Sequence, residues 1–75
     1  MYHTIKFTGE MTVDLEDSSK QPLEKLLIRK NTRLKAQIKP YVVESVDGPV
    51  EVADLFFADG TITRKVPFES FSFLG

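Results

Sequence analysis

Alternation of apolar and polar residues, the signature of strands with one buried face, covers much of this chain. From His3 to Leu15 the odd positions are mostly apolar and the even positions are polar. Side chains alternate between the two faces of a strand. The alternation keeps its parity through Gly9. A tight hairpin at Gly9-Glu10 would mix the faces, whereas a long strand bent at Gly9 keeps them apart, so the pattern favours the bent strand.

A second alternating stretch runs from Arg33 to Lys39. Its apolar positions are predicted to point inward, and they are Leu34, Ala36 and Ile38. Its polar positions are predicted to point outward, and they are Arg33, Lys35, Gln37 and Lys39. Pro40 is expected to interrupt the hydrogen-bonded ladder, as proline does in strands. A further strand is predicted over Tyr41–Val46, followed by a turn at Asp47-Gly48-Pro49.

The segment from Val50 to Val66 predicts a hairpin centred on Asp59-Gly60. These two residues suit the positive φ angles of a two-residue type I′ turn. That turn pairs Ala53 with Val66, Asp54 with Lys65, Leu55 with Arg64 and Phe57 with Ile62. The predicted core face therefore holds Ala53, Leu55, Phe57, Ile62 and Val66, with Arg64 as its one charge. The predicted solvent face holds Asp54, Phe56, Thr61, Thr63 and Lys65.

The remaining segments give shorter signals. Glu16–Gln21 reads as a polar loop. Pro22–Lys30 fits either a short helix that begins at Pro22 or a strand that buries Leu26 and Ile28. Asn31-Thr32 predicts a turn, because asparagine tolerates the left-handed conformation. After Pro67, a single tight turn over Phe68–Ser70 and a last strand over Phe71–Leu74 are expected.

Five to six short strands separated by turns predict an all-β protein, a small barrel of antiparallel strands. Two stretches carry a resemblance. LLIRKNTRL resembles the diverging turn of SH3 domains, and VPFESFSFL resembles their C-terminal strand, helical turn and last strand. The resemblance covers residues 23–75 and implies one SH3-like β-barrel domain over residues 1–75, with residues 9–23 as its long first loop. It concerns the fold alone. The proline-peptide groove does not carry over, because the chain has no tryptophan and Ser70 stands where the groove tyrosine would be.

Composition narrows the function. The chain has 75 residues, no cysteine and a single histidine, His3. These residues offer no thiolate metal site and no evident nucleophile beside a base, so we expect a protein that is not an enzyme and has no metal or other cofactor. The N-terminus has no apolar signal-peptide core, and no apolar run approaches the ~20 residues of a membrane span. We therefore expect a cytoplasmic protein without a membrane partner.

The charge is unevenly distributed along a chain whose net charge is −1. Residues 20–39 hold seven basic residues and one acid. Basic side chains on one strand face recur at ~6.5–7 Å, near the phosphate spacing of an extended nucleic-acid strand. The candidate site for phosphate, or for an acidic protein surface, is Arg33, Lys35, Gln37, Lys39 and Tyr41, with the tyrosine as a stacking surface. The same pattern also fits an ordinary solvated face or a lysine-protected edge strand.

Phenylalanines supply a second candidate surface, an interface with a partner or with another copy of the chain. Its residues are Phe56, which the predicted register places on the solvent face, and Phe68. Exposed phenylalanines that lie close together mark interaction sites. The sequence thus favours a non-enzymatic protein-interaction module that binds an unknown protein or itself. The alternative is a small barrel that binds single-stranded nucleic acid through its basic strand.

Overall fold

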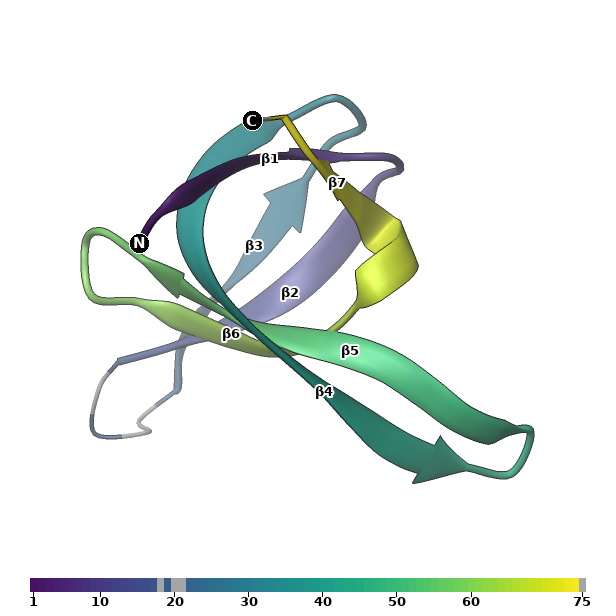
Figure 1. The fold of residues 1–75 in the computed structure, drawn as a ribbon. Coiled ribbons are helices and arrows are strands. Elements are labelled where there is room, and N and C mark those ends of the chain that lie inside the picture. Colours follow the sequence, from purple (N-terminus) through teal and green to yellow (C-terminus); the bar gives the residue numbers. More distant parts are fainter. Residues whose placement is uncertain (18, 20–21, 75) are drawn as a thin grey trace.

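The computed structural model describes residues 1–17, 19 and 22–74. These residues form one antiparallel sheet and a single turn of 3₁₀ helix, η1 (Phe68–Ser70), as Figure 1 shows. The strands are β1 (His3–Phe7), β2 (Met11–Glu16), β3 (Pro22–Ile28), β4 (Arg33–Ser45), β5 (Gly48–Phe57), β6 (Ile62–Pro67) and β7 (Phe71–Phe73). The predicted all-β class is confirmed. The described residues form seven strands, however, and not five to six.

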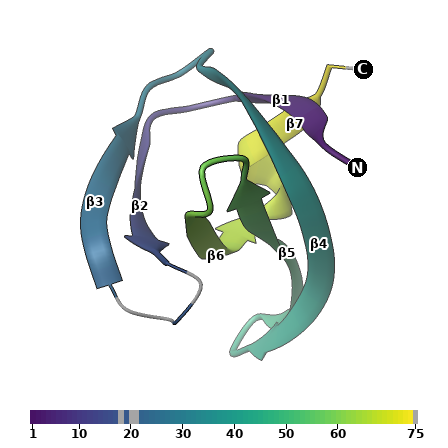
Figure 2. The same ribbon diagram turned by 90° about the vertical axis from the view of Figure 1, so that its left-hand side faces the viewer.

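The sheet curls into a half-barrel around the hydrophobic core (Figure 2). Its strand order is β3-β2-β6-β5-β4-β1-β7, so β3 and β7 form the two edges. The core fills the concave side and contains Ile5, Phe7, Val13, Leu15, Ile28, Ala36, Ala53, Leu55, Val66 and Phe71. Every strand except β3 and β7 has a neighbour on each side. None of the described residues belongs to a helix that is long and apolar enough to cross a membrane.

The first alternating stretch is bent, as its parity predicts. β1 pairs with β4 and β7, whereas β2 pairs with β3 and β6, so no hairpin forms at Gly9. Ile5, Phe7, Val13 and Leu15 are all buried on the concave side. The bend between the strands therefore changes the partners of the chain without changing the face that it buries.

Residues 22–28 form a strand, which decides between the two alternatives that the sequence left open. β3 pairs antiparallel with β2, from Met11 opposite Ile28 to Asp14 opposite Lys25. The expected long loop over residues 9–23 is thus wrong, since all of β2 lies within it. Of the predicted polar loop, Glu16 is the last residue of β2, and Ser18, Lys20 and Gln21 lie outside the described residues.

β4 runs without a break from Arg33 to Ser45, so the predicted interruption at Pro40 is wrong. Pro40 lies opposite Ala53 in the ladder with β5. The register of β1 on the other edge of β4 reaches only Ala36. A strand tolerates proline where its missing N–H faces an unpaired edge, which explains why the ladder continues. The turn before β4 is as predicted, because Asn31 has a φ of 71°.

The central hairpin forms, but its turn differs from the predicted type I′. The N–H of Gly60 donates to the carbonyl of Phe57 (3.1 Å), and the N–H of Phe57 donates to the carbonyl of Thr61 (2.9 Å). Ala58, Asp59 and Gly60 thus make a three-residue loop, in which Gly60 alone has a positive φ, 92°. This is a common hairpin geometry, a type I turn closed by a left-handed glycine.

The longer loop shifts the register next to the turn by one residue. Phe56 lies opposite Ile62 and Leu55 lies opposite Thr63, so the predicted pairs Phe57–Ile62 and Leu55–Arg64 are wrong. A β-bulge then restores the predicted pair of Ala53 and Val66. In this bulge Arg64 and Lys65 together oppose the single residue Asp54, and Lys65 has a φ of 58°.

The bulge explains which predicted faces are wrong. Thr63, expected on the solvent face, lies opposite Leu55 and is 1% exposed, whereas Asp54 keeps its predicted outward facing opposite Lys39 but is only 8% exposed. Arg64, expected in the core, is exposed instead. The extra residue reverses the facing of β6 on the turn side of the bulge, because a slip of one residue exchanges the faces of a strand. Ala53, Leu55 and Val66 are buried in the core as predicted, and Phe57 is half-buried against it. Ile62 is also buried, but it lies opposite Phe56 on the outer face and not on the predicted core face.

The conformation of Lys65 yields a stability test. A left-handed conformation costs an L-residue roughly 1–2 kcal/mol, and a β-branched side chain worsens the crowding. Lys65→Gly removes this strain but gains unfolded-state entropy, so its free energy of unfolding should stay within about 0.5 kcal/mol of the wild type. Lys65→Val should lower it by about 1–2 kcal/mol. Urea unfolding of the two variants measures the difference, and equal stabilities would contradict the bulge geometry.

Candidate functional site

The basic residues predicted on one face of β4 do share that face. Arg33, Lys35, Gln37 and Lys39 are exposed, whereas Ala36 is buried and Leu34 and Ile38 are half-buried against the core. The strand thus presents three cations and one amide on the convex, outer side of the half-barrel. We call these four residues the basic row.

β1 adds a cation that sequence reasoning missed. Lys6 lies directly opposite Arg33, and Thr4 lies opposite Lys35. Residues opposite each other in an antiparallel pair point to the same face. Lys6 occupies a polar, even position of the first alternating stretch, which indicates that it faces outward. The pairing of β1 with β4 spans almost thirty residues of sequence, and no local pattern reveals it.

β5 adds an aromatic residue in the middle of the basic row. Phe56 lies opposite Gln37, half-buried on the same outer face. Its diagonal neighbours on β4 are Lys35 and Lys39, within the ~7–8 Å that cross-strand diagonals span. Two candidate surfaces that the sequence kept separate, the basic strand and the Phe56 interface, are therefore one surface. Only the register of β4 against β5 brings them together.

Phe68, the other predicted interface residue, has different surroundings. Its ring lies 5.3 Å from that of Phe71 and 6.1 Å from that of Phe73, measured between centroids. The side chain packs against the core, to which Phe71 belongs. Phe68 thus sits in an aromatic cluster at the C-terminal end, whereas no ring contact of Phe56 is found among the described residues.

The positive charge of the basic row is not neutralised within the described part of the chain. The ion pairs found there join Arg29 to Glu10 and Arg64 to Glu16 and Asp54, and none involves the row or Lys6. Asp54 is the acid opposite Lys39. It is largely buried, however, and its charge is engaged by Arg64, whose Nη1 lies 3.1 Å from Oδ2.

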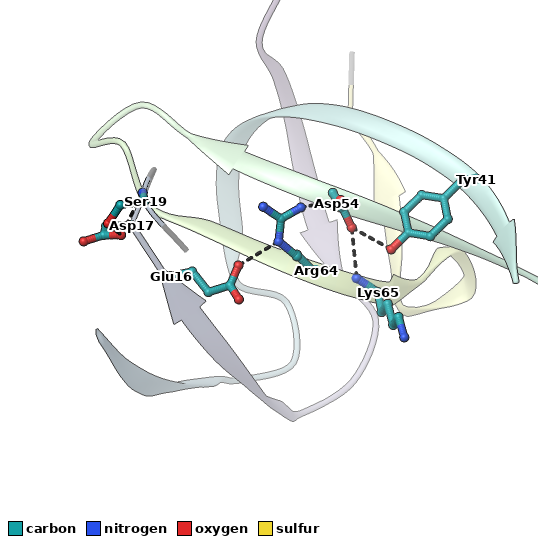
Figure 3. Close-up of polar contacts among 7 residues, drawn as sticks. All are labelled: Glu16, Asp17, Ser19, Tyr41, Asp54, Arg64 and Lys65. Atoms are coloured by element: carbon teal, nitrogen blue, oxygen red, sulfur yellow. Dashed lines mark hydrogen bonds and ion pairs between the residues drawn. The ribbon is translucent and has the colours of Figure 1, made fainter. Parts of the chain in front are cut away.

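Tyr41, the fifth predicted site residue, is held by this same carboxylate (Figure 3). Its hydroxyl donates a hydrogen bond of 2.8 Å to Oδ1 of Asp54, which also accepts the N–H of Lys65 at 3.2 Å. Arg64 continues the network across the sheet, because its Nε donates to Oε1 of Glu16 at 2.7 Å. Tyr41 follows Lys39 on the outer face, with its ring half-buried and its hydroxyl already bonded.

These contacts perturb two pKa values. Burial and the hydrogen bond to the Asp54 carboxylate raise the pKa of Tyr41 above its usual value of 10.0. The hydrogen bond to Glu16 raises the pKa of Arg64, which stays charged at every relevant pH. The protonated Tyr41 phenol is the form that the fold stabilises. Its contribution to stability is present below the unfolded-state pKa and is lost as pH rises through the folded-state pKa.

His3, the single histidine, packs edge-on against Phe73, with ring centroids 5.4 Å apart. No group of three potential metal ligands occurs among the residues that the structure describes. In the described structure, then, the aromatic-centred basic face of β1, β4 and β5 is the surface that brings together most of the predicted site residues.

No protein-family model matches this chain, and neither a curated protein nor a solved structure matches it. The geometry described above is therefore the basis of the functional proposals below.

The Tyr41–Asp54 hydrogen bond can be tested by titration. In a Tyr2→Phe variant, Tyr41 is the remaining tyrosine. Its absorbance near 295 nm should change at a pH above the ordinary phenol pKa of about 10. Adding Asp54→Asn should bring the midpoint down toward that value, because the negative charge is removed. An unchanged midpoint would show that the hydrogen bond does not form in solution.

The Asp54 network should also matter for stability. Asp54→Asn removes a largely buried charge that accepts three hydrogen bonds. We expect the free energy of unfolding to fall by roughly 2–3 kcal/mol, since bonds to charged groups contribute about 1.5–3 kcal/mol each and the amide retains some of them. Glu51→Gln, an exposed carboxylate on the same strand, is the matched control and should change stability by less than about 0.5 kcal/mol. Equal effects in urea unfolding would contradict the role of Asp54.

Proposed function

We propose that this protein is a non-enzymatic binding module that holds a single-stranded nucleic acid against the outer face of β4 and β5. The observation that carries the proposal is the position of Phe56, opposite Gln37 and diagonal to Lys35 and Lys39. Single-strand binders combine a base stacked on an aromatic ring with cations that follow the backbone. This face supplies both elements at adjacent positions.

The spacing of the cations supports an extended ligand. Alternate residues of a strand lie ~6.5–7 Å apart, close to the repeat of an extended phosphate backbone. Lys35 and Lys39 flank the ring of Phe56 on either side. Arg33 and Lys6 extend the charge across β1, as directly paired neighbours. A single-stranded nucleic acid that runs along β4 would thus contact cations through its phosphates on both sides of the base that stacks on Phe56.

Stacking and charge play separate parts on this surface. The chain as a whole has a net charge of −1, so long-range attraction of a polyanion is weak and affinity has to come from local contacts. With four cations on the face, the log–log dependence of affinity on salt should have a slope no steeper than roughly −3. Stacking on Phe56 adds a contribution of about 1–3 kcal/mol that does not depend on salt.

A second candidate is an acidic protein surface, in line with the protein partner that the sequence favours. The unneutralised charge of the basic row supports it equally, whereas the half-buried ring of Phe56 between the cations favours the nucleic acid. We further propose that the half-barrel is a variant of the SH3-like small barrel. Support comes from the left-handed turn at Asn31 before β4 and from η1 between Pro67 and β7. Small barrels use their sheet faces for nucleic-acid binding.

The proposed function is tested by titrating fluorescent single-stranded RNA and DNA at several salt concentrations. Phe56→Leu keeps an apolar side chain but removes the stacking face. It should weaken binding by about 5- to 100-fold and leave the salt slope unchanged. Lys35→Gln should make the slope shallower by about 0.7. Its matched control is Lys25→Gln on β3, off this face, which should change the slope by far less.

Two results would contradict the proposal. The first is no binding to either nucleic acid at low salt. The second is equal binding of a poly-glutamate peptide of matched charge, with no effect of Phe56→Leu on either ligand. The second result would assign the face to an acidic protein surface instead.

A further inference from the structure

β3 is an edge strand whose outer edge has no partner. It pairs with β2 on one side, and no described residue pairs with its other side (Figure 2). An edge of this kind presents a row of free N–H and C=O groups, which is a template for another strand. Leu26 and Leu27 lie on this strand and are 37% and 47% exposed. The edge is therefore unpaired in its backbone and apolar in its centre.

The concave side of the same edge opens onto an apolar hollow of about 450 Å³. Leu26 lines it from β3, Leu15 from β2, Leu34 from β4 and Phe57 from the end of β5. Leu26 lies opposite Val13, a core residue. A strand added to β3 would thus extend the sheet and cover side chains that border the core.

We propose that the partner of this edge is the β3 strand of a second copy of the chain, paired antiparallel about a twofold axis. The charges of the segment favour this occupant. Glu24 stands at one end and Arg29 and Lys30 follow the other end. An antiparallel copy places the acidic end of each strand beside the basic end of its partner. Opposite charges on facing strands stabilise a pair, and like charges directly opposite destabilise it.

The pleat of the strand restricts the register. Residues opposite each other point to the same face of the sheet. For the apolar side chains of both copies to lie on the concave side, the twofold axis must therefore pass beside one residue, which then faces its own copy, and not between two residues. Centring on Lys25 would place two lysines face to face. Centring on Leu27 would place Glu24 opposite Lys30, but it would also place Lys25 directly opposite Arg29. Centring on Leu26 places Leu26 opposite its own copy, Lys25 opposite Leu27 and Glu24 opposite Ile28.

The Leu26-centred register also accommodates the remaining charges. Glu24 becomes the diagonal neighbour of Lys30 of the second copy, and the symmetry produces this contact twice. The cations that approach each other on the outer face have acidic neighbours of their own. Lys25 lies opposite Asp14 on β2, and Arg29 forms an ion pair of 3.5 Å with Glu10. The strand pair is short, so its area falls below the ~800 Å² per partner of a standard interface, and we expect a weak dimer.

Disulfide trapping tests this register directly, because the chain contains no cysteine. In a Leu26→Cys variant the two cysteines lie directly opposite each other across the axis, with Cα atoms ~4.5–5.5 Å apart, within the range of Cα separations that a disulfide spans. Under mild oxidation it should form covalent dimers at least about tenfold faster than Val42→Cys, in which an exposed residue of β4 near the turn of the β4–β5 hairpin measures random collision. Equal rates for the two variants would overturn the proposal.

Sedimentation velocity of the unmodified chain gives an independent readout. The mean mass should rise toward that of a dimer as the concentration approaches the millimolar range, whereas Leu26→Arg should remain monomeric with an unchanged circular dichroism spectrum. A wild-type protein that is monomeric throughout this range would also overturn the proposal. Neither outcome depends on nucleic-acid binding, because β3 lies outside the basic face.

Discussion

Much of this half-barrel depends on the hydrogen bonds and the ion pair that the Asp54 carboxylate forms. This carboxylate accepts hydrogen bonds from Tyr41 on β4 and from both Arg64 and Lys65 on β6. Through Arg64 it is linked to Glu16 on β2. β2 and β6 share a single backbone register pair, Glu16 with Ile62. The side-chain network therefore adds contacts between the two neighbouring strands whose backbone pairing is weakest. Hydrogen bonds to charged groups contribute roughly 1.5–3 kcal/mol each, a large share of the stability of a small domain.

The β6 bulge at Arg64-Lys65 and the carboxylate of Asp54 depend on each other. Two residues of β6 oppose Asp54, which leaves the N–H of Lys65 without a ladder partner on β5 and lets the carboxylate accept it. Lys65 takes a left-handed conformation in the process. A bulge is a common device for re-aiming a side chain. Here it turns Arg64 outward, where it meets both Asp54 and Glu16, and it restores the register that buries Val66.

This arrangement also shapes the proposed binding face. Asp54 is the acid that lies opposite Lys39, and it would neutralise the basic row if it had no other partner. Arg64 engages it from the other side, so the row keeps its positive field next to Phe56. The candidate site thus borders a structural ion pair, that of Arg64 with Asp54. The β3 edge is a separate surface, with its own chemistry of free backbone groups and leucines.

Local chemistry accounts for the parts of the fold that the sequence predicted. The alternation of Arg33–Lys39 placed its cations outside because polar and apolar positions repeat with the period of a strand. Asn31 predicted its left-handed turn, and Gly60 its positive φ, because few residues tolerate that conformation. The parity of His3–Leu15 excluded a hairpin at Gly9. Each of these predictions depends on residues within a few positions of one another.

Long-range pairing decided the rest. Residues 22–28 satisfy both a helical and an extended pattern, and only β2 beside them fixes the strand. Pro40 stays in the ladder because no described residue pairs with the other edge of β4 at that point. The three-residue loop over residues 58–60 shifted the register of the central hairpin. Phe56 meets the basic row through the register of the β4–β5 hairpin, and Lys6 meets Arg33 through strands distant in sequence. The sequence by itself thus determined which residues face in or out along β1, β2 and Arg33–Lys39 of β4, but not along β6, where the bulge intervenes. The tertiary structure alone decided which strands are neighbours, because pairing energy depends on the partner and not on the segment.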